Sequence, residues 1–412
     1  MKNTSFHSPD FYVIDDLLNS EYILIRQSIR DFVNAEISPI IEECAEKAQF
    51  PAHLVKRFGD MGIFGPTIPL ELGGGGLDYI AYGLIMQELE RGDSGMRSVA
   101  SVQSSLVMYP INEFGSELQK RKFLPKLASG EFLGCFGLTE PDFGSDPANM
   151  ITKYEDKGDY YLLNGAKMWI SNSPLADMAL VWAKNEAGRI HGLIVERGME
   201  GFSTPEIDGK WSLRASCTGE LIFDNVKVPK ENILPGISGL AGPLKCLDAA
   251  RYGIAWGAVG AAMDCYDTAV QYSKERIQFG KPIASFQLIQ KKLAEMLTEI
   301  TKAQLLAWRL GVLKNQATHG PCGPGSPRIH LTPEATDAPL PDRPRRRRVR
   351  RRAGVGLCRS ADVPRRAGAA VGGHLLDGRH QGGQGEQPDH LPEGGGHQRQ
   401  APAGHHQAQH RQ

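Results

Sequence analysis

The stretch GCFGLTEPDFGSDP at 134–147, followed after a spacer by LNGAKMWISNS at 163–173, organises the rest of the chain. Its first part combines glycines with Thr and Ser hydroxyls, a composition that brings bare backbone and short hydrogen-bond donors close to a planar polar ligand. The second part contains an Asn-Gly pair at 164–165, which predicts a hairpin that carries Trp169 out on a strand. An indole beside a hydroxyl suits the binding of a conjugated ring. The same pattern also fits a glycine-rich surface loop followed by a hairpin with a core Trp.

Length and composition indicate a globular protein of two or three domains, with 412 residues and 41% hydrophobic side chains. The chain contains no run of about eighteen apolar residues that could span a membrane. Its opening, MKNTSFHSPDFYVIDD, resembles neither a secretion signal nor an import signal, so we expect a cytoplasmic protein. The seven cysteines are scattered and odd in number, which favours reduced thiols over a metal site or disulfides.

Hydrophobic periodicity predicts an α+β protein with several domains. We expect an N-terminal α-helical domain over 1–133, with Asn19 as the N-cap of its first helix. Short apolar runs bounded by turn residues predict a middle β-domain over 134–238, built as an antiparallel barrel or sandwich. Helical spacing resumes in a C-terminal bundle over 239–314, which includes one long helix over 287–313. The bundle is incomplete, because no apolar helix follows it.

The segment 315–412 has a different composition from the rest of the chain. After Asn315 it contains no Phe, Tyr, Trp, Met or Lys, so it cannot bury a core. One interpretation is a disordered arm whose RPRRRRVRRR run at 343–352 neutralises nucleic-acid phosphates. The other is a segment translated out of frame, which we favour because the long helix would otherwise expose an apolar stripe without partners. We therefore expect no nucleic-acid partner.

The sequence resembles the acyl-CoA dehydrogenases from about Asp15 to Asn315. Its blocks FGLTEP, GSD and WISN match the FAD-binding motifs of that family, and four further blocks match in the same order. Within the family it is similar to the glutaryl-CoA dehydrogenases. The further blocks are ELERGDSGMRSVASVQSSLVMYPI (88–111), GKWSLRASCTGEL (209–221), ARYGIAWG (250–257) and ERIQFGKPIASFQLIQKKLAEM (275–296).

The resemblance implies an FAD site with two sets of residues. The first set would cradle the cofactor and line its ring system: Phe136, Leu138, Thr139, Ser145, Trp169, Ile170 and Ser171. The second set, Arg276, Phe279 and Gln287, matches residues that reach the FAD of a neighbouring subunit, and therefore implies a homotetramer. Without the resemblance, Arg276 would be a solvated helix charge and Phe279 a core side chain.

The resemblance also implies an acyl-CoA site. Glu90, Arg97 and Ser98 match the positions that hold the distal carboxylate of a glutaryl chain, a task that suits a guanidinium. The competing interpretation is a surface ion pair between Glu90 and Arg97 on one helix face. Contacts with the acyl-CoA are implied for Ser145 and for four positions of the segment leading to Arg251, namely Leu244, Leu247, Asp248 and Arg251.

The implied reaction is the α,β-dehydrogenation of glutaryl-CoA and its decarboxylation to crotonyl-CoA, with electrons passing to an electron-transfer flavoprotein. Such a reaction needs a carboxylate base for the α-proton. The family carries this glutamate in a Tyr-Glu-Gly-Thr motif near the C-terminus, and no such motif occurs here. The acids Glu334, Glu386 and Glu393 follow no Tyr, and we assign the role to none of them. Alternatives are a monocarboxylic acyl-CoA dehydrogenase and a non-catalytic FAD- or acyl-CoA-binding homologue.

Overall fold

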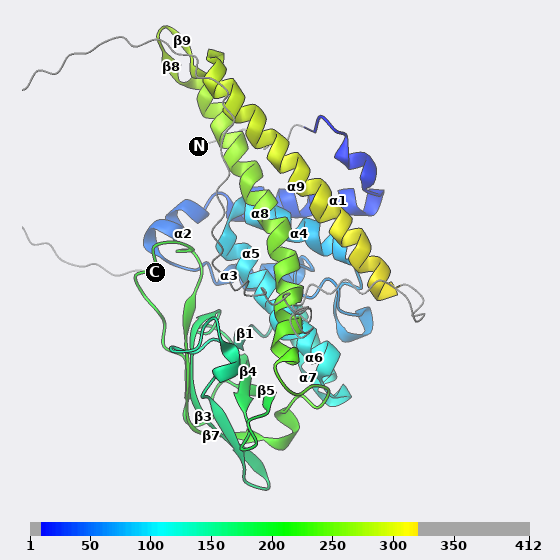
Figure 1. Ribbon diagram of the computed structural model, residues 1–412, viewed down its shortest axis with the longest axis vertical. Helices are drawn as coiled ribbons and strands as arrows, with labels where there is room; N and C mark the ends of the chain where they lie inside the picture. The colour runs from blue at the N-terminus through cyan, green and yellow to red at the C-terminus, as the bar shows by residue number, and fades with distance from the viewer. Residues whose placement is uncertain (1–9, 320–412) are drawn as a thin grey trace, which may run out of the picture. The chain divides into compact units, whose positions relative to one another are not determined.

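The computed structural model describes residues 10–319, with the backbone alone at 318 and 319. A group of helices, a β-sheet and a pair of long helices follow one another along this range (Figure 1). Residues from 320 onward lie outside the described residues, and with them the arginine-rich run at 343–352, for which a nucleic-acid-binding arm and an out-of-frame segment were the two interpretations.

The N-terminal part is helical, as predicted. The expected N-cap is confirmed, because the side-chain oxygen of Asn19 accepts a hydrogen bond from the Tyr22 backbone N–H at 2.8 Å. The elements of this part are η1 (Ile14–Leu17), α1 (Ser20–Phe32), η2 (Val33–Ile37), α2 (Ile41–Lys47), α3 (His53–Asp60), η3 (Leu70–Leu72), α4 (Tyr79–Gly92), α5 (Ser94–Ser101), η4 (Val102–Met108), α6 (Tyr109–Phe114) and α7 (Glu117–Ala128).

A buried charge network joins α1 to α4. The Glu88 carboxylate accepts hydrogen bonds from Arg30 at 2.8 Å and from Arg91 at 3.0 Å, and its side chain is fully buried. Burial raises the pKa of Glu88, but the two guanidinium groups outweigh this effect and hold the pKa below its ordinary value. The carboxylate is therefore charged in the core, where it fixes α1 against α4.

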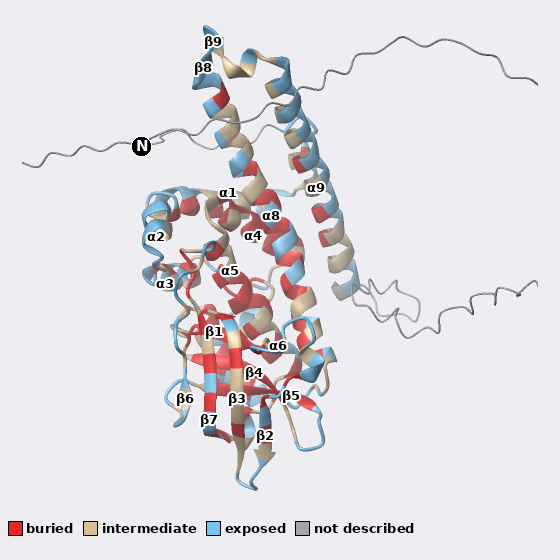
Figure 2. Ribbon diagram, turned by 60° about the vertical axis from the view of Figure 1, so that its left-hand side comes forward, coloured by how far each residue is buried: buried red, intermediate tan, exposed pale blue. Residues whose placement is uncertain are grey.

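The middle part is a seven-stranded sheet of order β1-β4-β2-β3-β7-β6, with β5 paired to β4. One buried core joins the helices of the first part to sheet residues such as Leu180 and Trp182, and a second core contains alternate residues of the same strand, such as Ala179 and Val181. Buried residues are red in Figure 2. The elements of the middle part are β1 (Gly134–Gly137), η5 (Pro147–Asn149), β2 (Lys153–Asp156), β3 (Tyr160–Ser171), β4 (Met178–Lys184), β5 (Ile190–Glu196), β6 (Phe202–Ser203), β7 (Thr218–Pro229) and η6 (Lys230–Asn232).

Two details of the sheet differ from the sequence-based expectation. The sheet is mixed and not purely antiparallel, because β1 runs parallel to β4 and β2 meets β4 in parallel. The predicted hairpin at 164–165 is also wrong, since both residues lie inside the continuous strand β3. Gly165 takes φ +139°, and the pairing of β3 with β7 shifts register there. The Asn-Gly pair therefore forms a bulge in a long strand. A bulge, like a hairpin turn, can use the positive φ that glycine adopts.

The C-terminal part consists of two long helices, α8 (Ala241–Glu275) and α9 (Gln287–His319). The prediction of a long helix over 287–313 is confirmed. A short connection joins them through β8 (Ile277–Gln278), β9 (Lys281–Pro282) and η7 (Ile283–Ser285). The two helices run side by side in Figures 1 and 2. Among residues 10–319, no helix is both long and apolar enough to cross a membrane.

The end of α9 is tied to the start of α4. The Asn315 side chain accepts a hydrogen bond from the Tyr79 backbone N–H at 2.9 Å and donates one to Asp78 at 2.7 Å. Asp78 is also the N-cap of α4, where it accepts from the Ala81 backbone N–H at 3.0 Å. The ammonium group of Lys314 lies 4.4 Å from the ring centre of Tyr79. The last described turns of α9 thus complete the cap of α4.

Close packing of α8 against α4 requires a residue without a side chain at position 260. A Cβ atom at Gly260 would lie 1.9 Å from the backbone oxygen of Gln87 on α4. We expect Gly260→Ala to lower the free energy of unfolding by about 1–3 kcal/mol, because the two helices must move apart. Urea unfolding followed by circular dichroism measures this. Ala258→Ser, which adds one atom to an exposed position of the same helix, is the control, with an expected change below about 0.5 kcal/mol. Equal unfolding midpoints for the two variants would contradict this account of the packing.

Candidate active site

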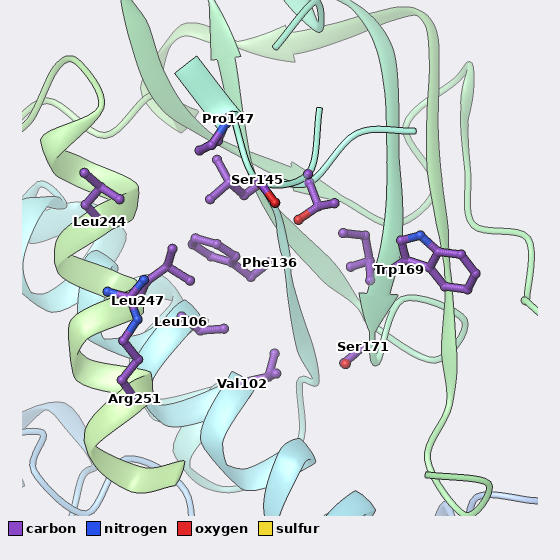
Figure 3. A pocket seen from close by; sticks show the side chains of 14 residues that line it. Val102, Leu106, Phe136, Ser145, Pro147, Trp169, Ser171, Leu244, Leu247 and Arg251 are labelled. Atoms are coloured by element: carbon purple, nitrogen blue, oxygen red, sulfur yellow. The ribbon is translucent and has the colours of Figure 1, made fainter. Parts of the chain in front are cut away.

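A cavity of about 410 Å³ lies between the sheet, η4 and α8 (Figure 3). Its volume falls in the range of small-molecule sites, which span roughly 300–1,000 Å³. Segments far apart in the sequence meet around it. The residues that line it are Val102, Leu106, Phe136, Leu138, Thr139, Gly144, Ser145, Pro147, Trp169, Ile170, Ser171, Leu244, Leu247 and Arg251.

The chain leaves the sheet at the end of β1 and returns to the cavity through a tight turn. Parallel pairing with β4 places Phe136 in the sheet, and its ring packs edge-to-face on Trp182 with centroids 6.3 Å apart. The turn is closed by backbone hydrogen bonds in both directions between Glu140 and Phe143, at 3.2 and 3.3 Å. The residues after the turn, including Ser145, then face the cavity. All four residues predicted from this motif therefore line it.

Trp169 reaches the cavity through an irregularity in β3. Its φ of +62° lies in the left-handed region, which is uncommon for a bulky residue, and the pairing with β7 is interrupted between Lys167 and Ile170. The Met168 backbone N–H instead donates to Thr139 O at 2.9 Å. The Trp169 side chain is consequently 57% exposed, whereas Ile170 is buried. The indole lines the edge of the cavity, and in Figure 3 it points away from Phe136 and the side chains of α8.

A second cavity, of about 480 Å³, shares Trp169 and Ser171 with the first. Its remaining wall is formed by the loop before β7, with an exposed Trp at its tip. The other lining residues are Ile207, Asp208, Gly209, Lys210, Trp211, Ser212, Leu213 and Thr218. Trp169 therefore borders open space in both cavities.

The helix α8 supplies the opposite wall of the first cavity. Leu244, Leu247 and Arg251 lie three and four residues apart and so share one helix face. In Figure 3 Leu247 points from α8 toward Phe136. The fourth predicted residue of this segment, Asp248, does not line the cavity and accepts a hydrogen bond from Arg251 at 2.7 Å.

Four residues that line the cavity were not predicted from the sequence as ligand-binding. Val102 and Leu106 lie one turn apart in η4 and share a face, and this spacing was a signal that could have identified them. Gly144 is one of the glycines of the predicted motif but was not assigned to the site, and Pro147 lies two residues after the predicted Ser145.

Glu90, Arg97 and Ser98 do not line this cavity. Arg97 donates hydrogen bonds to the Glu90 carboxylate at 2.6 and 3.4 Å, and the two side chains are only 12% and 9% exposed. The competing interpretation of a surface pair on one helix is wrong, because the pair is mostly buried and spans the break between α4 and α5, where Asp93 caps α5. A Cβ at Gly257 of α8 would lie 1.8 Å from Glu90 Oε2, so the pair packs directly on that helix. Gly257 is six residues, about 9 Å, along α8 from Arg251.

Arg276, Phe279 and Gln287 lie at the connection between α8 and α9 and do not reach the cavity. All three are exposed, and Phe279 is 91% exposed with φ +52°. The alternative of a core position for Phe279 is therefore wrong.

The cavity contains hydroxyl groups and an aromatic face but no acid. Thr139, Ser145 and Ser171 provide hydroxyls, and Arg251 is the only charged residue among the lining residues of the described range. This set fits a planar polar ligand that stacks on Trp169 and exchanges hydrogen bonds at its edge. It provides no carboxylate that could remove a proton. Within residues 10–319, no cluster of three or more His, Cys, Asp or Glu side chains could hold a metal ion.

Most of the described range is similar in sequence to one family of known proteins. Models of the acyl-CoA dehydrogenase N-terminal, middle and C-terminal domains match residues 19–131, 135–226 and 238–326. The chain is 41% identical over 313 residues to a glutaryl-CoA dehydrogenase of Desulfococcus multivorans, covering 74% of this chain and 80% of the relative. It is 38% identical over 298 residues to the mitochondrial short-chain specific acyl-CoA dehydrogenase of Rattus norvegicus, covering 71% and 72%. The crystal structure of a glutaryl-CoA dehydrogenase from Mycobacterium smegmatis in complex with FADH2 aligns with a TM-score of 0.73 and 46% identity, covering 74% of this chain and 79% of that one.

Proposed function

Because the chain belongs to the acyl-CoA dehydrogenase family, we propose that its cavity binds FAD beside Trp169 together with the thioester end of an acyl-CoA. The observation that carries this proposal is the meeting of Thr139, Ser145, Trp169 and Ser171 around one cavity faced by α8. When bound, FAD supplies the acceptor for the hydride that leaves the β-carbon of the acyl chain. The protein contributes binding, orientation and the exclusion of water.

Each wall of the cavity has a separate task in this proposal. The Trp169 indole provides the stacking surface, and the hydroxyls of Thr139, Ser145 and Ser171 exchange hydrogen bonds with polar atoms of the ring system. Leu244 and Leu247 of α8 cover the opposite side and keep water from the reacting carbons. Arg276, Phe279 and Gln287 are exposed at the far end of α8, and we propose that they serve the FAD of a neighbouring subunit in a homotetramer.

We propose glutaryl-CoA as the substrate, with decarboxylation to crotonyl-CoA and an electron-transfer flavoprotein as the acceptor in the cytoplasm. Arg97 supports this choice, because it is a mostly buried guanidinium that packs on the same helix as the cavity wall. One observation favours a second candidate, a short-chain monocarboxylic acyl-CoA. The charge of Arg97 is already balanced by Glu90 at 2.6 Å, so a substrate carboxylate would have to compete with a protein carboxylate.

Removal of the indole tests the FAD site. We expect Trp169→Ala to weaken FAD binding by about 10- to 100-fold, because the stacking of a planar ring on an aromatic side chain contributes about 1–3 kcal/mol. FAD titration of the 412-residue chain, followed by flavin fluorescence, measures the dissociation constant. Trp169→Phe should retain most of the affinity. Leu118→Ala, which shortens a 79% exposed side chain on α7, should leave it unchanged. An unchanged dissociation constant in Trp169→Ala would refute the proposed site.

A further inference from the structure

A buried ion pair connects the segments that line the cavity, although neither of its members lines the cavity itself. Lys167 Nζ lies 2.9 Å from Glu140 Oε1, and the two side chains are 0% and 1% exposed. Lys167 precedes Trp169 by two residues, and Glu140 directly follows Thr139. The pair thus stands next to both halves of the proposed FAD site.

The lysine joins β3 to the chain leaving β1. Its ammonium group donates a second hydrogen bond to Leu138 O at 3.1 Å, and Leu138 lines the cavity. The backbone of the next residue, Met168, donates to Thr139 O at 2.9 Å. Two successive residues of β3 therefore hold two successive residues of the cavity wall.

The glutamate holds the turn that brings Ser145 to the cavity. Its carboxylate accepts hydrogen bonds from the backbone N–H groups of Ile151 at 2.7 Å and Thr152 at 3.0 Å, on the far side of the turn. Its own backbone closes the turn with Phe143. The carboxylate consequently fixes both ends of the loop that carries Ser145.

The same pair lies beside the strained backbone of Trp169. A bulky residue in the left-handed region costs roughly 1–3 kcal/mol and persists only where the surroundings hold it. Burial lowers the pKa of Lys167 to about 8. Burial raises the pKa of Glu140, but the attraction of Lys167 and the hydrogen bonds from Thr152 and Ile151 bring it below its ordinary value. Both groups are therefore charged at neutral pH, when the pair is strongest.

We propose that the Glu140–Lys167 ion pair positions the cavity wall: it maintains the bulge that turns Trp169 toward the ligand and fixes Thr139 and Ser145 relative to that indole. Both members are positioning residues, since neither lines the cavity. The identity of the ligand, FAD, rests on the proposed function. The effect of the ion pair on the bulge in β3 can be measured in the ligand-free chain.

Hydrogen–deuterium exchange of the ligand-free, 412-residue chain tests the proposal, with overlapping peptides that cover residues 166–172. The informative variants are Lys167→Met and the double variant Glu140→Gln/Lys167→Met, which leaves no unpaired buried charge. We expect exchange of the Met168 amide to be on the order of 100-fold faster in both. Peptides over 190–196 in β5 report on the sheet as a whole, and they should exchange at the wild-type rate in the double variant. The control is Asp156→Asn/Lys230→Met, which removes a partly exposed ion pair between β2 and η6.

FAD titration of the same variants provides the second measurement. We expect about 10-fold weaker binding in the double variant and no change in the control. A folded double variant with wild-type exchange over 166–172 would overturn the proposal, and so would local exchange that rises no more than exchange over 190–196. Absence of FAD binding by the wild-type chain would overturn the proposed function instead, and the exchange measurement would still decide the role of the ion pair.

Discussion

The 412-residue chain, loaded with FAD and supplied with glutaryl-CoA, is expected to oxidise its substrate at least about 10²- to 10⁴-fold more slowly than a family member that carries the catalytic glutamate. This range is the usual contribution of a general base. None of the described residues that line the cavity is acidic, and the sequence contains no Tyr-Glu-Gly motif. The hydroxyls of Thr139, Ser145 and Ser171 are too weakly basic to take the α-proton near neutral pH.

Two measurements separate loss of the base from loss of the flavin. Reduction of a dye reports the whole reaction, whereas exchange of the α-protons of bound acyl-CoA with D2O requires only the base. We expect both to be slower in this chain by at least about 10²-fold. The matched control is the same gene with the reading frame after Asn315 restored, which we expect to encode a Tyr-Glu-Gly motif and to regain both activities. Substantial turnover by the chain as it stands would contradict this account and would direct attention to Glu334→Gln, Glu386→Gln and Glu393→Gln.

The second large effect is expected at Arg97. If its guanidinium receives the distal carboxylate of the substrate, Arg97→Met should weaken glutaryl-CoA binding far more than butyryl-CoA binding. Truncation of one partner of a buried charge pair costs about 2–5 kcal/mol, or roughly 30-fold to several-thousand-fold. Binding is the informative measurement, because it needs no base, and calorimetric titration with each acyl-CoA provides it. The neutral substrate corrects for any general damage to the fold.

Substitution of Glu90, the partner of Arg97, is expected to change glutaryl-CoA affinity in the opposite direction. Glu90→Gln removes the carboxylate that lies 2.6 Å from Arg97 and therefore leaves the guanidinium charge unbalanced. Glutaryl-CoA should then bind more tightly, while butyryl-CoA binding should change little. Equal losses for both substrates in Arg97→Met, with no gain in Glu90→Gln, would show that the pair is structural and would favour the monocarboxylic substrate.

Local pattern predicted the helices well, because a helix depends on neighbouring residues. The N-cap Asn19 and the long helix over 287–313 are of this kind, whereas the residues around Ser145 were implied by the family resemblance and not by local pattern. The pattern failed where distant segments decide the outcome. The Asn-Gly pair at 164–165 has the conformational freedom of a hairpin turn, but pairing with β7 carries the strand through it. Parallel pairing of β1 with β4 likewise depends on segments some forty residues apart.

Charged residues were the hardest to interpret from the sequence. A lysine at position 167 on a strand and an arginine at 97 beside glycines both resemble solvated charges. The structure buries Lys167 completely and Arg97 mostly, because Glu140 and Glu90 reach them from other elements. No spacing rule connects residues 140 and 167. Their pairing requires β3 and the chain that leaves β1 to lie side by side in the fold.

The link between Asn315 and Asp78 has a consequence for the order of events during synthesis. It joins residues 237 positions apart. Each doubling of a loop adds only about 0.6 kcal/mol to the cost of closing it, so the long separation costs little stability. It does cost time, since translation at about 5–20 residues per second needs roughly 10–50 s to pass from Asp78 to Asn315. Throughout that interval the start of α4 is on the nascent chain without the partner that completes its cap.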